Sequence, residues 1–174
     1  MLRNRELLRL DLGIFTPHAV LTAMFLIVPD LLRTTLGVAV HDQWVVYLPV
    51  LIVSVAAMVP PIIVAEKYRR MKTMFVGAVV TLLISQVMLY FGADNSFTLV
   101  CALVVFFSAF NVMEASLPSL ISKVAPAEVK GTAMGVYSSL QFLGVFIGGI
   151  VGGKAHEHGG SAGVFGLTTA LAAT

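Results

Sequence analysis

The chain has few charged residues. Lys, Arg, Asp and Glu make up 11% of its 174 residues, and hydrophobic residues make up 58%, whereas a soluble domain carries about 25% charged residues. A helix needs about 20 mostly apolar residues to cross ~30 Å of hydrocarbon. The composition therefore excludes a water-soluble domain and predicts a polytopic membrane protein. Five stretches of eighteen or more residues lack any Lys, Arg, Asp or Glu: 12–29, 43–65, 73–93, 95–113 and 131–153.

The chain also has only one cysteine and a small net charge. The single cysteine, Cys101, lies in an apolar stretch, which rules out an internal disulfide and favours an inert buried thiol. The net charge of +2 is too small to indicate a nucleic-acid partner. Basic residues precede the first apolar stretch, as in a signal peptide, but no small-residue cleavage site follows them. We interpret residues 1–11 as a cytoplasmic flank of the first span.

The basic residues predict an orientation. If the N-terminus is cytoplasmic, nine of them fall on the cytoplasmic side and two, Arg33 and Lys154, fall outside. The positive-inside rule therefore favours a cytoplasmic N-terminus. The nine are Arg3, Arg5, Arg9, Lys67, Arg69, Arg70, Lys72, Lys123 and Lys130.

We expect an all-α membrane helix bundle of five complete transmembrane helices and a truncated sixth. The sixth begins near Ser161, and the ~14 residues to Thr174 give ~21 Å of helix, short of the ~30 Å required. Brief loops at 92–96 and 126–130, and an outer loop at 154–160, predict antiparallel neighbours. Residues 1–174 form one unit with no soluble domain. The expected spans are 10–32, 44–65, 73–93, 97–121 and 132–153.

Two long segments carry a family resemblance. Residues 106–153 read FFSAFNVMEASLPSLISKVAPAEVKGTAMGVYSSLQFLGVFIGGIVGG, and residues 7–25 read LLRLDLGIFTPHAVLTAMF. The first resembles the tenth and eleventh helices of a major facilitator superfamily transporter, and the second resembles the seventh. The likeness is greatest to the YajR-like branch of proton-coupled drug antiporters.

A loop adds to this resemblance. Residues 64–72, VAEKYRRMK, occupy the place where the second half of the family repeats the loop G-x-L-A-D-R-x-G-R-K. Ile62 and Arg69 replace the two glycines of that pattern, and Met71 replaces its last lysine. In the family this loop clamps the cytoplasmic side, so the resemblance makes Glu66, Lys67 and Arg70 the candidate cytoplasmic gate.

The resemblance implies half of a transporter. Family members have two six-helix halves with the substrate cavity between them, and this chain is similar to the second half, helices 7 to 12. It implies proton-coupled efflux of small molecules or drugs across a bacterial inner membrane, with no cofactor and no enzymatic activity. The expected partners are the lipid bilayer, a missing N-terminal six-helix half, a small-molecule substrate and protons. The alternative is a non-transporting scaffold or a truncated, inactive gene product.

Glu114 is the one carboxylate well inside a span. Such a charge is costly in hydrocarbon and usually faces a cavity or a partner. Asn111 lies one turn before it and Pro118 one turn after; Pro118 cannot donate to the Glu114 carbonyl, so we expect a kink there. Two interpretations stay open: a protonatable site in the cavity, or a structural acid bonded to neighbouring helices.

Three further residues complete the cavity set, and three glycines form a packing face. His18 lies near the middle of the first span, where it either serves proton coupling or bonds to a neighbouring helix, and Pro17 predicts a bend beside it. Tyr137 and Gln141, one turn apart, complete the cavity set of His18, Asn111, Glu114, Tyr137 and Gln141. A small-residue face on the same span favours close helix packing, either inside the bundle or as a sliding surface toward the missing half. That face consists of Gly144, Gly148 and Gly152.

The outer loop holds two histidines around an acid. His156, Glu157 and His158 supply at most half a zinc shell, and no cysteine or further histidine is near in sequence. We therefore expect a solvated loop and no metal site.

Overall fold

The computed structural model describes residues 5–174, with side chains from residue 9 onward, and the described residues contain no strand. The helices are α1 (Arg5–Phe25), α2 (Val28–Leu36), η1 (Val40–Asp42), α3 (Trp44–Lys67), α4 (Met71–Gly92), α5 (Ser96–Val124), η2 (Ala127–Val129) and α6 (Lys130–Ala172). Within this part of the chain, α3, α4, α5 and α6 are each long and apolar enough to span a membrane. The bent pair of α1 and α2 makes a fifth candidate. The prediction of an all-α polytopic membrane fold is confirmed.

The first span bends after α1. α1 runs as one helix through Pro17, and a 45° bend lies between α1 and α2, while the bend expected at Pro17 stays a prediction. Pro29, in the first turn of α2, cannot donate a hydrogen bond to Phe25. At the break, the amides of Leu26 and Ile27 bond three residues back, to Ala23 and Met24. α5 likewise stays one helix through Pro118.

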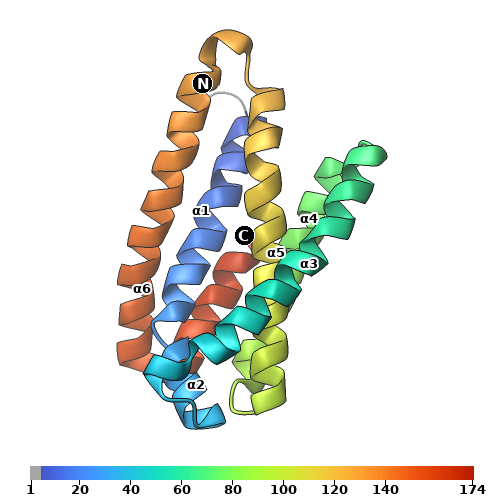
Figure 1. Cartoon of the computed structure of the whole chain (residues 1–174). Coiled ribbons are helices and arrows are strands. Elements are labelled where there is room, and N and C mark those ends of the chain that lie inside the picture. The colour runs from blue at the N-terminus through green and yellow to red at the C-terminus, as the bar shows by residue number, and fades with distance from the viewer. Residues whose placement is uncertain (1–4) are drawn as a thin grey trace.

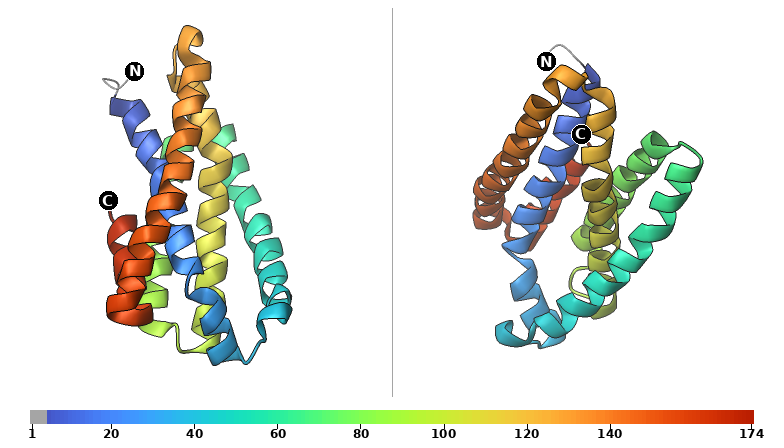
Figure 2. Two further views of the ribbon diagram at one scale, coloured as in Figure 1. Left: turned by 90° about the vertical axis from the view of Figure 1, so that its left-hand side faces the viewer. Right: turned by 45° about the horizontal axis from the view of Figure 1, so that its top comes forward.

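α6 contains the chain reversal that was predicted as an outer loop. The helix continues past Lys154 instead of ending before it, so the loop predicted at 154–160 is wrong. The backbone leaves the helical conformation at Gly160 (φ 58°, ψ −145°), which glycine adopts without steric cost. The segment after Gly160 then returns beside the first one (Figure 2). Gly163 lies against the Ala155 carbonyl, where an added Cβ would overlap it.

The helices form a bundle around α5 (Figure 1). α1 lies between α5 and the first segment of α6, and its most extensive packing is with α6. α3 and α4 pack on α5 from the other side and lean away from α1 and α6 toward the end where the N-terminus lies. Ile14, Met24, Leu103, Phe106 and Phe165 are fully buried in the shared core.

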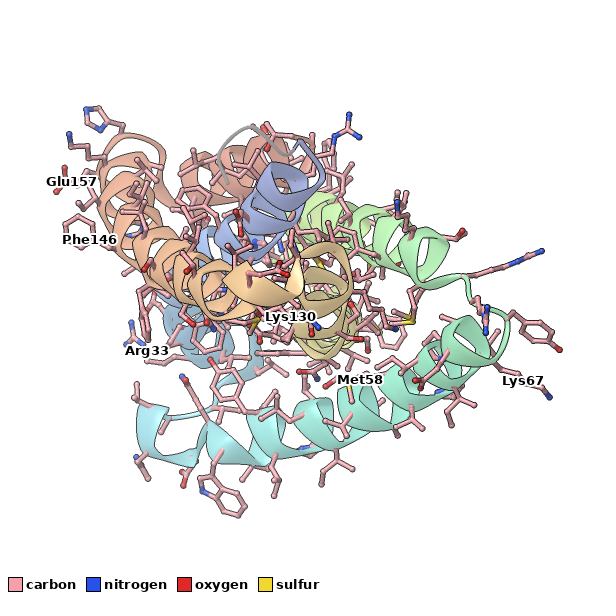
Figure 3. The ribbon with its side chains drawn as sticks, turned by 90° about the horizontal axis from the view of Figure 1, so that it is seen from above. Arg33, Met58, Lys67, Lys130, Phe146 and Glu157 are labelled. Atoms are coloured by element: carbon pink, nitrogen blue, oxygen red, sulfur yellow. The ribbon has the colours of Figure 1, made fainter. Side chains whose placement is uncertain are left out.

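The turns alternate between the two ends of the bundle. The start of α1, the α3–α4 turn and η2 lie at one end, and α2, the α4–α5 turn and the Gly160 reversal lie at the other (Figure 1). Large apolar side chains cover much of the outer surface: Trp44, Ile52 and Phe146 are each more than 60% exposed. Phe146 points away from the bundle (Figure 3). Such a surface suits contact with hydrocarbon.

Candidate functional site

Three polar side chains from three helices meet inside the bundle. His18 comes from α1, Glu114 from α5 and Gln141 from α6. The His18 Nε2 lies 3.0 Å from the Glu114 Oε1. The Gln141 Nε2 lies 2.9 Å from the same His18 nitrogen and 3.3 Å from the same Glu114 oxygen. We call these three residues the polar cluster.

The histidine is held firmly in the cluster. Its side chain is 8% exposed, whereas that of Glu114 is 32% exposed. The His18 Nδ1 lies 3.0 Å from the Ile14 carbonyl oxygen, one turn earlier on α1, and the ring of Phe110 packs against the imidazole with centroids 5.2 Å apart. Since a carbonyl oxygen can only accept, Nδ1 carries a hydrogen, and Nε2 is the nitrogen that faces Glu114.

This geometry can hold a proton. A hydrogen bond between Nε2 and Oε1 needs one hydrogen, either on the imidazole or on the carboxyl group.

The other two cavity candidates lie outside the polar cluster. Asn111 donates to the Ser54 hydroxyl at 3.1 Å and so joins α5 to α3. The hydroxyl of Tyr137 is buried and has no hydrogen-bond partner among the described residues. Ser54 is a site residue that the sequence reasoning missed. Its signal was a polar residue in the middle of an apolar span, opposite a helix that carries an amide.

The candidate gate lies on the α3–α4 turn. Glu66, Lys67 and Arg70 are exposed there, and no ion pair joins them within the described residues. The Lys67 Nζ lies 5.8 Å from the Tyr68 ring centroid, and Lys67 is at the outer edge of the molecule (Figure 3). Their role as a gate stays a prediction.

The backbone of this turn explains one departure from the family pattern. Arg69, where the pattern has glycine, adopts a left-handed conformation with φ 54°. Its amide bonds to the Glu66 carbonyl, and the Arg70 amide bonds to the Ala65 carbonyl. These two bonds form the Schellman arrangement that commonly ends a helix with glycine. The turn therefore keeps a glycine conformation without the glycine.

The glycine face of α6 packs inside the bundle. An added Cβ at Gly144 would overlap the Phe15 carbonyl oxygen, and one at Gly148 would overlap the Ala19 carbonyl oxygen. A Cβ at Gly152 would lie 2.8 Å from the Ala23 Cα. The three glycines are covered by α1, so they are not free to slide on another half. We call this contact the glycine seam.

The histidines near the reversal are exposed. His156, Glu157 and His158 are exposed on helix α6 and not on a loop. The His158 ring bonds to the Lys154 carbonyl at 2.8 Å. No group of three or more metal-ligating side chains occurs from residue 9 to Thr174, the part of the chain with described side chains.

Comparison with known proteins identifies the family of the chain. The sequence profile of the Major Facilitator Superfamily matches residues 11–174. The chain belongs to this family, which consists of membrane transporters.

Individual relatives sharpen the comparison. The chain is 42% identical over 173 residues to the inner membrane transport protein YajR of Escherichia coli (strain K12), covering 99% of this chain and 38% of that protein. It is 32% identical over 156 residues to an uncharacterized transporter of Buchnera aphidicola (subsp. Baizongia pistaciae), covering 88% of this chain and 39% of the relative. The chain thus spans under two fifths of the length of these relatives.

Proposed function

We propose that the chain is the C-terminal six-helix half of a proton-coupled secondary transporter that exports small molecules across a bacterial inner membrane. The observation that carries the proposal is the His18–Glu114 contact, 3.0 Å long, inside the membrane-spanning part of the bundle. Ionisable residues in such positions are costly and usually mark ion or substrate pathways. The partner is an N-terminal six-helix half, with substrate bound between the halves.

Binding and release of a proton at the polar cluster drive transport. When Glu114 and His18 share a proton, α1 and α5 are joined by a charge-assisted or carboxyl hydrogen bond. When the proton leaves, that bond is lost and the two helices are held less strongly. A proton gradient thus shifts the balance between two states of the bundle, as alternating access requires. The name of the Escherichia coli relative, a transport protein of the inner membrane, supports the membrane and the general activity.

Replacing the acid tests this function. Glu114→Gln keeps the size and the hydrogen bonding of the side chain but removes its proton exchange. In the assembled two-half transporter it should reduce pH-driven accumulation in liposomes to background, while exchange down a substrate gradient continues. Glu157→Gln, on an exposed acid of α6, is the matched control and should transport like the parent. Uphill transport by Glu114→Gln at the parental rate would make the acid structural.

Reassembly tests the partner. Co-expression with a matching first half should restore proton-driven export, and the 174-residue chain alone should move no substrate, because one half cannot enclose a cavity. Transport by the purified chain alone, with cross-linking that finds no dimer, would contradict the assignment of this chain as a half.

Orientation is proposed from the basic residues. We place the N-terminus and the α3–α4 turn in the cytoplasm and the α6 reversal outside. In a Cys101→Ala background, an impermeant thiol reagent on intact cells should label Lys154→Cys and not Lys72→Cys. Both positions are exposed, so accessibility within the fold does not bias the result, and the reverse labelling would invert the topology.

A further inference from the structure

We propose that Gln141 is the positioning residue that lets the His18–Glu114 pair exist both with and without its proton, by turning its side-chain amide. The inference rests on the proposed function, because it names the group that makes both proton states of that pair accessible. It begins from the three short distances in the polar cluster.

The histidine presents one nitrogen to two partners. With Nδ1 bonded to the Ile14 carbonyl, Nε2 has either one lone pair or one hydrogen to offer. That nitrogen lies 3.0 Å from the Glu114 oxygen and 2.9 Å from the Gln141 amide nitrogen. The state of this single position therefore decides which orientation of the amide is favourable.

Without the proton, the pair consists of two acceptors. A lone pair on Nε2 and an ionised carboxylate 3.0 Å apart repel each other. The Gln141 NH₂ group has two hydrogens and lies within hydrogen-bond distance of both acceptors, 2.9 Å from Nε2 and 3.3 Å from Oε1. The amide orientation in the structure thus stabilises the proton-free pair.

With the proton, this orientation becomes unfavourable. The pair now holds a hydrogen between Nε2 and Oε1, and the NH₂ group would face either an N–H donor or an acceptor already in use. Turning the amide by 180° presents its carbonyl oxygen instead, which accepts from the shared hydrogen. The last torsion of glutamine is broad and two-fold, so the turn needs no displacement of α6.

The surroundings leave this task to Gln141. Asn111, the nearby amide of α5, is committed to Ser54. Besides His18 and Glu114, the buried titratable groups on α1, α5 and α6, within the described side chains, are Asp11, two turns earlier on α1, and Tyr137 on α6, which is close enough to Glu114 to feel its charge. From residue 9 onward, the charged residues elsewhere on these three helices are exposed. No hydrogen bond to the pair is observed for Asp11 or Tyr137 in that part of the chain.

Nuclear magnetic resonance on the 174-residue chain in lipid nanodiscs tests the proposal. The chain is labelled with ¹⁵N-histidine and ¹⁵N-glutamine. The signals of His18 and Gln141 are identified as those that disappear in His18→Asn and in Gln141→Met. In the parent, the Gln141 NH₂ signal should change with the same pH midpoint as the His18 Nε2 signal. In Gln141→Met, which keeps the length but donates no hydrogen bond, the proton-free pair loses its stabilisation. The His18 midpoint should then move to higher pH by about one unit, a tenfold change in proton affinity.

A matched control separates this role from a structural one. Gln43, just before α3, is also buried and donates to the carbonyl of Pro29 in α2. Gln43→Met should therefore lower stability and leave the His18 midpoint unchanged. Gln141→Asn, whose shorter amide cannot reach both partners, should shift the midpoint in the same direction if Gln141→Met fails to fold. An unchanged midpoint in a folded Gln141 variant overturns the inference and leaves the proposed function standing. No His18 titration in the parent overturns both.

Discussion

The two helices that flank the central pair of α1 and α5 are held in different ways. α6 lies on α1 with glycines against backbone carbonyls, whereas α3 meets α5 through side chains and one polar contact, from Asn111 to Ser54. The most apolar stretches of α3 and α6 are equally buried, 17% in each, so the two helices differ in the kind of contact and not in how much of them is covered. Without a hydrophobic driving force between helices in lipid, close backbone packing supplies much of the attraction. α1 and α6 therefore have the closer backbone contact, and α3 is attached to α5 mainly by side chains.

The largest effect is expected at the glycine seam. Gly148→Ala places a methyl group onto the Ala19 carbonyl and must push α6 away from α1, which should lower the free energy of unfolding by about 2 kcal/mol, as overpacking does. Gly153→Ala on the same helix meets nothing within 4 Å and should be neutral or slightly stabilising. Unfolding in detergent, followed by circular dichroism, measures both. Equal stability of the two variants would show that the seam is loose.

A smaller, stabilising effect is expected at the α3–α4 turn. Arg69→Gly keeps the left-handed backbone and removes its steric cost, so stability should rise by about 1 kcal/mol. Arg70→Gly, next to it at φ −107°, gains nothing of this kind and should be neutral or destabilising. The same unfolding measurement compares the two. A loss of stability in Arg69→Gly would mean that the arginine side chain has a role at the turn beyond the backbone.

The smallest effect is expected between α3 and α5. A double-mutant cycle with Ser54→Ala and Asn111→Ala isolates the energy of their hydrogen bond, which should be about 0.6 kcal/mol, the average for such bonds in membrane proteins. The reference pair is Gly148→Ala with Ser54→Ala. These two residues share no contact, so their effects on the free energy of unfolding should add. A coupling energy above about 2 kcal/mol would make the α3 contact as firm as the seam.

Much of this fold could be predicted from the sequence because hydrocarbon imposes a simple rule. Four of the five charge-free stretches each lie in a single helix to within one residue, the stretch 12–29 is divided between α1 and α2, and the short turns at 92–96 and 126–130 are present. Helix ends that fall within uncharged sequence were harder to predict, because no charged residue marks them. The bend before Pro29 and the reversal at Gly160 depend on single backbone positions, and polar residues such as His156 remain helical.

The site was predictable as a set of residues and not as contacts. His18, Glu114 and Gln141 stood out because polar groups are costly within apolar spans. Which of them meet depends on how α1, α5 and α6 are rotated, and packing across the bundle decides that rotation. The pairing of Asn111 with Ser54 and the burial of the glycines against α1 were hidden for the same reason.

The glycine seam also constrains the order in which the protein can be made. Phe15, Ala19 and Ala23 meet Gly144, Gly148 and Gly152 in the same order along the chain, so α1 and this part of α6 run parallel and no short turn could join them. At about 5–20 residues per second of synthesis, the partner of α1 emerges on the order of ten seconds after α1 itself. Until then the backbone of α1 faces lipid or a transient companion. The three helices of the polar cluster therefore come together late, after most of the chain is already in the membrane.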